Sequence, residues 1–169
     1  MDVGRVVNLM GEITYRSIGV IHSPFRSIEG MPIQPSGAKD VLGTVEIAPE
    51  YADGLEGIEG FSHIILLYSF HLSQGYSLKV KPFLDENLHG VFATRAPRRP
   101  NPIGVSVVRL LRVEGCTLHI ADVDTVDGTP LLDVKPYVPE FDVRRVERIG
   151  WLSERAGKVY EARSDGRFR

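Results

Sequence analysis

Short segments of β-branched and aromatic residues run along most of the chain, separated by Gly, Pro and Asp. This punctuation is typical of a mainly β protein, because a helix requires apolar residues at three- and four-residue spacing over a longer window. In residues 117–123, for example, Leu118 and Ile120 alternate with Thr117 and His119, as in a strand with one buried face. The pattern predicts strands at residues 14–21, 43–48, 63–70, 90–94, 103–113, 117–123 and 133–138.

One segment between these strands has a helical pattern. Residues 49–60 begin with a proline, and Tyr51, Leu55 and Ile58 follow at spacings of four and three, so we expect a short helix that covers a barrel end or a sheet face. Strands of this number and length predict a small closed or nearly closed β-barrel with short helices and long Pro/Gly loops. We expect one domain over residues 1–169, with a core at 15–142 and a C-terminal extension at 143–169 that packs on the barrel.

Composition limits the class of protein without naming it. Hydrophobic residues make up 43% of the chain and charged residues 25%, which are globular values, and the formal net charge is −2. The single cysteine, Cys116, excludes an intrachain disulfide and a cysteine-rich zinc site. No segment approaches the roughly 20 apolar residues of a membrane span. We therefore expect a soluble cytoplasmic protein that binds no metal and no membrane.

Positive charge is concentrated in one stiff loop. Residues 95–102, "RAPRRPNP", contain three prolines and three arginines, and residues 88–113 contain five arginines and no acid. The prolines fix the backbone and remove N–H donors, so the segment is a loop whose arginines lose little entropy when they bind. Guanidinium groups suit phosphates, carboxylates and the faces of nucleobases. A proline-stiffened turn whose arginines pair with nearby carboxylates is an equally acceptable interpretation.

A second candidate segment is "DGTPLLDVKPY", residues 127–137. Asp127 and Gly128 form a turn signature, and the exposed backbone of such a turn suits a purine edge or an amino-acid moiety. Asp133, Lys135 and Tyr137 then alternate onto one face of the next strand, with an acid, a base and a phenol side by side. Taken alone, a structural hairpin with a surface charge pair explains this segment better.

Two weaker signals complete the candidate chemistry. Residues 23–35 form a long Pro/Gly loop in which Gln34 carries an amide suited to a nucleobase or a carboxyl group. His63 and His71 bracket the apolar run "IILLYSF", where one would belong to the core and one would mark the open end of the strand. No zinc-binding histidine spacing, glycine-rich phosphate loop or nucleophile elbow is present in the sequence.

Four blocks of the sequence together resemble one family. These blocks are "SIGVIHSPF", "PEYADGLEGIEGFSHIILLYSFH", "GVFATRAPRRPNPIGVSVVRLL" and "DVDTVDGTPLLDVKPYVPEFD", and the likeness covers residues 15–142 in order. They resemble the TsaA-like family of tRNA (adenine-37-N6)-methyltransferases, also called TrmO, and the closing "ARSDGRFR" is similar to the tail of its short members. The resemblance implies a β-barrel methyltransferase that uses S-adenosylmethionine without a Rossmann fold, methylates threonylcarbamoyladenosine beside the tRNA anticodon, and forms a homodimer with the cofactor site near the subunit interface.

The same resemblance implies residue roles. The cofactor contacts carry over to Pro32, Ile33, Gln34, His71, Leu72, Arg95, Val105, Asp127, Gly128, Thr129 and Pro130. Two positions depart from the family pattern: Arg98 stands where an aromatic residue is common, and Ile33 where an arginine is common. We also expect no extra C-terminal domain of the kind found in longer members.

The chemistry of this substrate class suggests further roles. The N6 atom of threonylcarbamoyladenosine is bonded to a carbonyl and is a poor nucleophile, so methyl transfer calls for alignment and for help with proton removal. The candidate bases are Asp133, Tyr137 and His71. The candidate contacts to the threonyl carboxylate and to tRNA are Arg98, Arg99, Asn101 and Lys135, together with Arg95, and such binding should weaken with salt. No metal is needed, because the sulfonium is already activated.

Three other functions stay open at this point. The chain would be a non-catalytic RNA-binding barrel if the cofactor pocket were lost, and such a module would ignore S-adenosylmethionine. It would be a methyltransferase for another nucleoside or a small molecule if Ile33 and Arg98 change the substrate. A hydrolase for an acidic small molecule lacks a convincing nucleophile or metal set.

Overall fold

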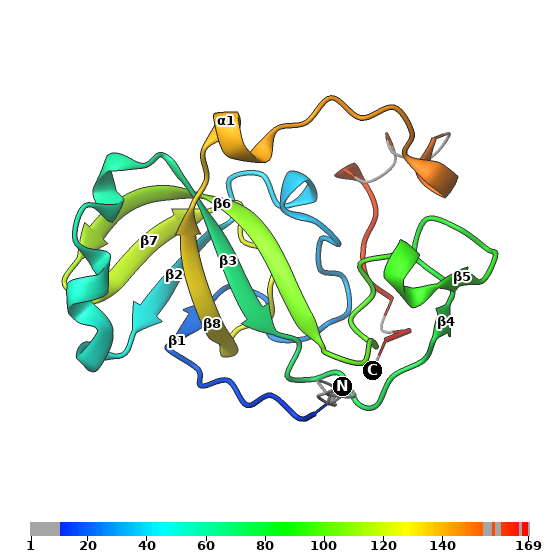
Figure 1. The fold of residues 1–169 in the computed structure, drawn as a ribbon, viewed down its shortest axis with the longest axis horizontal. Coiled ribbons are helices and arrows are strands. Elements are labelled where there is room, and N and C mark those ends of the chain that lie inside the picture. The colour runs from blue at the N-terminus through cyan, green and yellow to red at the C-terminus, as the bar shows by residue number, and fades with distance from the viewer. Residues whose placement is uncertain (1–10, 154–156, 158–159, 166, 169) are drawn as a thin grey trace, which may run out of the picture.

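The structure is a computed structural model that describes residues 11–153, 157, 160–165 and 167–168. Six antiparallel strands close into a barrel in the order β1-β2-β7-β6-β3-β8 (Figure 1). The strands are β1 (Gly19–His22), β2 (Leu42–Ile47), β3 (His63–Ser69), β6 (Ile103–Glu114), β7 (Thr117–Ala121) and β8 (Thr129–Pro136). The mainly β closed barrel predicted from the sequence is confirmed.

Strict alternation of side chains fills the barrel. In β3, Ile64, Leu66 and Tyr68 are buried, whereas the residues between them are half-buried on the outer face. The inward residues of the other strands meet them, and the core includes Ile21, Val45, Val108, Leu118, Ile120 and Leu131, each at most 1% exposed. Burial of this set of aliphatic side chains holds the barrel closed.

The helices are short. They are η1 (Pro35–Gly37), η2 (Pro49–Leu55), η3 (Ile58–Gly60), η4 (Val91–Ala93), α1 (Pro139–Asp142) and η5 (Gly150–Leu152), of which only α1 is α-helical. The helix predicted at residues 49–60 is therefore two 3₁₀ segments. Leu55 enters the core and Ile58 packs against it, but Tyr51 stays 37% exposed. None of the described helices is long and apolar enough to cross a membrane.

The strands differ most from the prediction at three places. The predicted strand 90–94 is wrong, because Val91–Ala93 is the 3₁₀ segment η4 and only His89–Gly90 pairs, as β5, with β4 (Lys79–Val80). The first strand begins at Gly19 rather than at residue 14. The last strand begins at Thr129, four residues before the predicted start. It starts early because residues 129–131 pair with β1 across the barrel closure.

A second layer lies beside the barrel (Figure 1). It contains the β4–β5 pair, the proline loop (residues 95–102) and the C-terminal segment. These segments share a small core of Val80, Val91, Ala96 and Phe168, with Phe83 packed against it. In contrast, the start of the C-terminal extension is solvent-facing: Val143 and Val146 are 59% and 64% exposed. Parts of several predicted functional segments meet between this layer and the end of the barrel.

Candidate active site

A cavity of about 1020 Å³ opens at the end of the barrel where β3 finishes and β6 begins. Its walls come from residues within the segments 28–36, 68–73, 82–84, 92–97, 99–105 and 124–126, from Thr129, and from the C-terminal residues Trp151, Leu152, Ser164 and Phe168. Small-molecule sites typically enclose about 300–1,000 Å³, so this cavity has room for a large ligand or for two smaller ones side by side.

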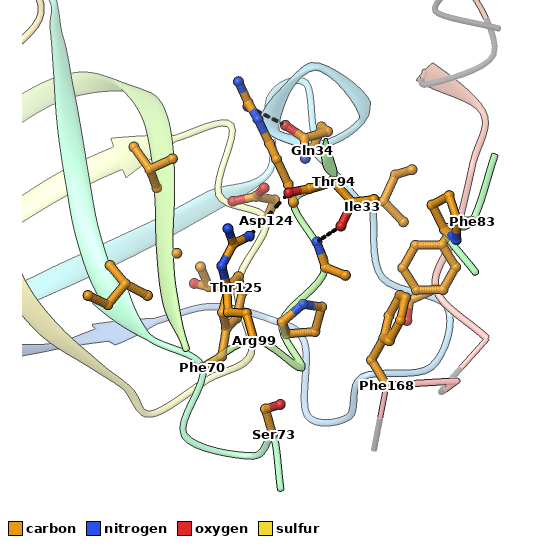
Figure 2. Close-up of a pocket in the computed structure, with 18 of the residues that line it drawn as sticks. Ile33, Gln34, Phe70, Ser73, Phe83, Thr94, Arg99, Asp124, Thr125 and Phe168 are labelled. Carbon is orange, nitrogen blue, oxygen red and sulfur yellow. Dashed lines mark hydrogen bonds between the residues drawn. The ribbon is translucent and has the colours of Figure 1, made fainter. Parts of the chain in front are cut away.

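The proline loop forms the cationic wall. The Arg95 guanidinium donates a hydrogen bond to Gln34 Oε1 at 3.0 Å, which connects the proline loop to the loop of residues 23–35 (Figure 2). Arg99 donates to the backbone carbonyl of Thr94 at 3.2 Å, and the Thr94 hydroxyl accepts from the Ala96 N–H at 3.2 Å. These contacts, together with the prolines, hold two guanidinium groups at the cavity before any ligand binds.

The segment that follows β7 is held by a charged cluster of Asp40, Arg109 and Asp122, here called the charged clasp. Asp40 and Asp122 both have positive φ angles, 62° and 71°, which are unfavourable for residues other than glycine. Asp122 accepts hydrogen bonds from the Asp40 N–H at 2.7 Å and from Arg109 Nε at 2.8 Å. Burial opposes ionisation of Asp122, but these hydrogen bonds from Arg109 and Asp40 lower its pKa. The ionised clasp therefore fixes the start of residues 122–129, which run along the cavity.

Polar groups without partners mark the cavity as a ligand site. Among the described residues, the hydroxyl oxygens of Ser73, Thr125 and Ser164 are buried and have no hydrogen-bond partner, and all three residues line the cavity. A buried polar group without a partner costs about 1–3 kcal/mol, so three around one cavity indicate hydrogen bonds left for a ligand. Asp124 adds a carboxylate to the cavity lining next to Thr125 (Figure 2).

The opposite wall is aromatic. Phe83 and Phe168 pack edge to face with ring centroids 5.0 Å apart, and in Figure 2 they lie across the cavity from Asp124 and Thr125. Trp151 donates its indole N–H to the carbonyl of Ala93 at 2.8 Å and stacks on His89, with centroids 4.7 Å apart. An apolar wall facing a polar wall suits a ligand with a flat ring at one end and charged groups at the other.

The C-terminal segment is tied to this wall through backbone hydrogen bonds. The Gly30 N–H donates to the Ser164 carbonyl, and the Ser164 N–H donates to the Met31 carbonyl, both at 2.8 Å. Arg167 lies over the Phe83 ring at 5.1 Å from its centroid. Trp151, Leu152, Ser164 and Phe168 of the extension therefore line the cavity, and Phe168 also packs in the core of the loop layer.

Most residues predicted to contact the cofactor line the cavity. They are Pro32, Ile33, Gln34, His71, Leu72, Arg95, Val105 and Thr129, joined by Arg99 and Asn101 from the predicted substrate set. The structure thus brings the proline loop and one end of the Asp-Gly-Thr-Pro turn to a single cavity, as the resemblance implies.

The rest of that turn lies outside the cavity lining. Asp127 accepts hydrogen bonds from the Ser23 N–H at 3.2 Å and from His22 Nδ1 at 3.1 Å, and pairs with Arg26. The hydrogen bond from Ser23 first, and then the one from His22, hold the pKa of Asp127 below its usual range. In the single chain Asp127 fastens the turn to β1, and Gly128 and Pro130 are not among the residues that line the cavity.

Asp133, Lys135 and Tyr137 lie away from the cavity lining, on the outer surface of the barrel. The register between β3 and β8 shifts at Leu67 and Tyr68, so that Leu132 is an extra residue. This bulge places Leu131 inside the barrel and Asp133 outside. Lys135 forms a surface ion pair with Asp133 at 2.7 Å, and Tyr137 lies near His63 at the opposite end of β3, with ring centroids 6.3 Å apart. Asp133 and Tyr137 are therefore not positioned as bases for this cavity in one chain.

Arg98 also lies outside the cavity lining. Its backbone carbonyl accepts from the Ser77 N–H at 3.2 Å, and its buried Nε has no partner among the described residues. The sequence reasoning missed Asp124, Thr125, Ser73 and the aromatic wall. Asp124 and Thr125 stand in the motif block that carries the turn, but alternation alone could not distinguish them from Asp122 or Asp127.

A closed antiparallel barrel with a partly cationic, partly aromatic cavity at one end defines a small-molecule-binding β-barrel without a Rossmann nucleotide site. Over the described part of the chain, no group of three or more His, Cys, Asp or Glu residues could hold a metal ion. The family model of the tRNA-methyltransferase O N-terminal domain matches residues 20–143, which is most of the barrel and cavity. The chain therefore belongs to the TrmO family.

Curated relatives and solved structures agree with this membership. A Pyrococcus abyssi protein described as a probable S-adenosyl-L-methionine-binding protein is 61% identical over 156 residues, covering 92% of this chain and 85% of that protein. The Escherichia coli tRNA (adenine(37)-N6)-methyltransferase is 40% identical over 140 residues, covering 77% of this chain but only 60% of that enzyme. The crystal structure of TrmO from Pseudomonas aeruginosa matches with a TM-score of 0.70 and 40% identity, covering 83% of this chain and 63% of that chain.

Proposed function

We propose that this protein is an S-adenosylmethionine-dependent methyltransferase that acts on N6 of threonylcarbamoyladenosine at position 37 of tRNA. The observation that carries the proposal is the single cavity in which Gln34, Arg95 and the buried hydroxyls of Ser73, Thr125 and Ser164 meet. Membership of the TrmO family, and relatives described as tRNA methyltransferases, support the reaction class. A tRNA substrate also fits the cytoplasmic location predicted from the sequence.

The residues present fit this cofactor. The unpartnered hydroxyls and the Arg95–Gln34 pair would bind its polar groups, and the apolar wall of Phe83 and Phe168 would cover its adenine ring. S-adenosylmethionine supplies a methyl group that is already activated. The protein therefore has to bind the cofactor and the nucleoside, align them, and accept one proton. Because the cavity, at about 1020 Å³, is as large as the largest typical small-molecule sites, it has room for the target nucleoside as well.

The substrate contacts divide by location. Arg99 and Asn101 line the cavity and would hold the threonyl carboxylate of the target nucleoside. Arg98 and Lys135 lie outside it and would contact tRNA phosphates. His71 lines the cavity and remains a candidate for the proton acceptor, whereas Asp133 and Tyr137 would need a second chain or a rearrangement to reach it.

The experiment that tests this function compares tRNA with and without the threonylcarbamoyl group. Purified protein, labelled S-adenosylmethionine and each tRNA are incubated, and the digested nucleosides are separated and identified. We expect the methyl group only in threonylcarbamoyladenosine. Equal labelling of both tRNAs would refute the substrate and keep the enzyme class. A protein that binds tRNA but not S-adenosylmethionine would be an RNA-binding module. If the protein is the enzyme, Arg95→Ala should weaken its binding of S-adenosylmethionine.

The protein is also proposed to form a homodimer with the cofactor site near the interface. Ile103, Val105 and Val107 alternate onto the outer face of β6 and are 40%, 45% and 36% exposed. They pair with β3 residues, and Ile65 and Leu67 of β3 share this outer face. Ile103 and Val105 also line the cavity, so a second copy on this apolar face would lie beside the cofactor.

A further inference from the structure

Asp124 provides a carboxylate in the cavity that has no role in the reaction as described so far. It follows β7 and lines the cavity between the cationic wall and the barrel end (Figure 2). The Ser106 hydroxyl donates to Asp124 Oδ1 at 2.6 Å, and the carboxylate also accepts from its own backbone N–H. An ionised carboxylate can accept about four hydrogen bonds, so accepting capacity remains for a ligand in the cavity.

The contacts behind Asp124 form a chain of donors. Ser106 uses its proton for Asp124, so its oxygen must accept from the Tyr68 hydroxyl, which lies 3.0 Å away. Burial first, and then the charge of Asp124, raise the pKa of Tyr68 well above its ordinary value, so the phenol keeps its proton. Tyr68 and Ser106 are 4% and 2% exposed. Both groups are therefore placed to orient the carboxylate, and the hydrogen bond from Ser106 favours its ionised form.

The surroundings of Asp124 suit a group that gains and loses a proton near neutral pH. Desolvation is the largest influence and raises the pKa of Asp124 to about 6, against the lowering effects of the Ser106 hydrogen bond and of the Arg95 charge. Among the described residues, Arg95 on the proline loop is the charged group that lowers the pKa of Asp124, and the charge of Asp124 in turn raises the pKa of Tyr68 on β3. A general base works best when its pKa lies near the working pH.

We propose that the Asp124 carboxylate is the base that removes the proton from the target nitrogen during methyl transfer, with Ser106 and Tyr68 as positioning residues. The inference rests on the proposed function. In the step, N6 of the adenine forms a bond to the methyl carbon while the bond from that carbon to sulfur breaks. The sulfonium becomes a neutral thioether, and the N6 proton moves to Asp124 and later to water. The threonylcarbamoyl carbonyl helps, because it delocalises the charge that develops on N6.

The first test compares Asp124→Asn with the wild-type chain. Methyl transfer to threonylcarbamoylated tRNA is followed in single turnover, and S-adenosylmethionine binding is measured by calorimetry. We expect the transfer rate to fall roughly 10²- to 10⁴-fold, with the cofactor dissociation constant changed less than about threefold. Asp53→Asn removes an exposed carboxylate at the far end of the barrel, in η2, and should change neither quantity.

The pH dependence gives a second readout. Because Asp124 must be ionised to accept a proton, the wild-type rate should rise through about pH 6 and level off above it. Ser106→Ala removes a hydrogen bond that favours the carboxylate, so the rise should move to higher pH while the rate at pH 8 largely recovers. A purely structural role for Ser106 would lower the rate equally at all pH values.

A third readout needs no substrate. In the ligand-free wild-type chain, the side-chain carboxyl carbon of Asp124 should titrate near pH 6 by NMR. Full activity of Asp124→Asn, or a flat wild-type profile between about pH 5 and 8, would overturn the inference and leave the methyltransferase assignment standing. A large loss of cofactor affinity in Asp124→Asn would also overturn it, in favour of a cofactor-binding role. A wild-type chain that methylates no tRNA would refute the proposed function, and this inference with it.

Discussion

Gly104 is the residue that lets Tyr68 reach the polar network of the cavity. Its backbone lies opposite Tyr68 in the β3–β6 pairing, and the tyrosine ring rests directly on it. A Cβ at this position would lie 2.5 Å from Tyr68 Cζ and 2.9 Å from Phe70 Cζ, distances that real side chains do not tolerate. The absence of a side chain at residue 104 therefore sets the position of the Tyr68 hydroxyl beside Ser106.

We predict that Gly104→Ala lowers the free energy of unfolding by about 1–3 kcal/mol, because two rings must shift in a closely packed place. It should also reduce methyl transfer, since the Tyr68 hydroxyl would lose its contact with Ser106. Urea denaturation measures the first effect and a single-turnover assay the second. Gly54→Ala is the matched control, because nothing lies within 4 Å of the added methyl group. A Gly104→Ala protein as stable and as active as the control would contradict this packing.

At the scale of the elements, the sequence predicts the barrel better than it predicts the site. Six of the seven predicted strands exist, because each has one buried face and alternation reports burial directly. The seventh, residues 90–94, has strand-forming residues but finds only the two-residue β4 as a partner. Pairing partners are a property of the folded chain, so local composition could not exclude this strand.

The bulge at Leu132 shows why the sequence could not place the site residues of β8. The period-two pattern correctly places Asp133 and Lys135 on one face of a strand. Which face turns outward depends on the register shift beside Tyr68, and a register shift leaves no mark in a single sequence. The alternative weighed from the sequence, a surface charge pair, is what the structure has at Asp133 and Lys135.

The outer face of β3 and β6 carries the prediction at this scale. If a second copy covers this face, Val107→Asp should convert the dimer to a monomer of 18.8 kDa, because a buried unpaired carboxylate is costly. Sedimentation equilibrium measures the mass. Val146→Asp places the same charge on an exposed valine of the extension, where we expect the dimer to persist. A wild-type chain that sediments as a monomer, or a Val107→Asp protein that stays dimeric, would refute the proposed interface.

At the scale of the whole molecule, the cavity is built from segments that are distant in the sequence. Gln34, His71, Arg95 and Thr129 come from four loops or strand ends that the barrel brings to one side. The blocks that carry the family resemblance supply His71, Arg95 and Thr129, and Gln34 comes from the loop between the first two blocks, so resemblance found these residues where periodicity could not. Phe168 lies beyond the residues that the family model matches, and no pattern in the sequence connected it with the cavity.

The structure also shows where one departure from the family pattern, Ile33, lies in the folded molecule. Ile33, where the family commonly has an arginine, lines the cavity beside Gln34 and near the aromatic wall (Figure 2). It makes that side of the cavity more apolar, and the cationic contacts are left to Arg95 and Arg99. Specificity for the threonyl carboxylate would then depend on the proline loop alone.

The central claim is that this cavity holds S-adenosylmethionine between the Arg95–Gln34 pair and the aromatic wall. A crystal structure of the protein with S-adenosylhomocysteine tests it most directly. The account predicts the nucleoside in the cavity, with its polar groups hydrogen-bonded to residues among Gln34, Arg95, Thr125 and Ser164 and its adenine against the aromatic side chains. Well-defined ligand at any other place on the molecule, with this cavity left to solvent, would contradict the account.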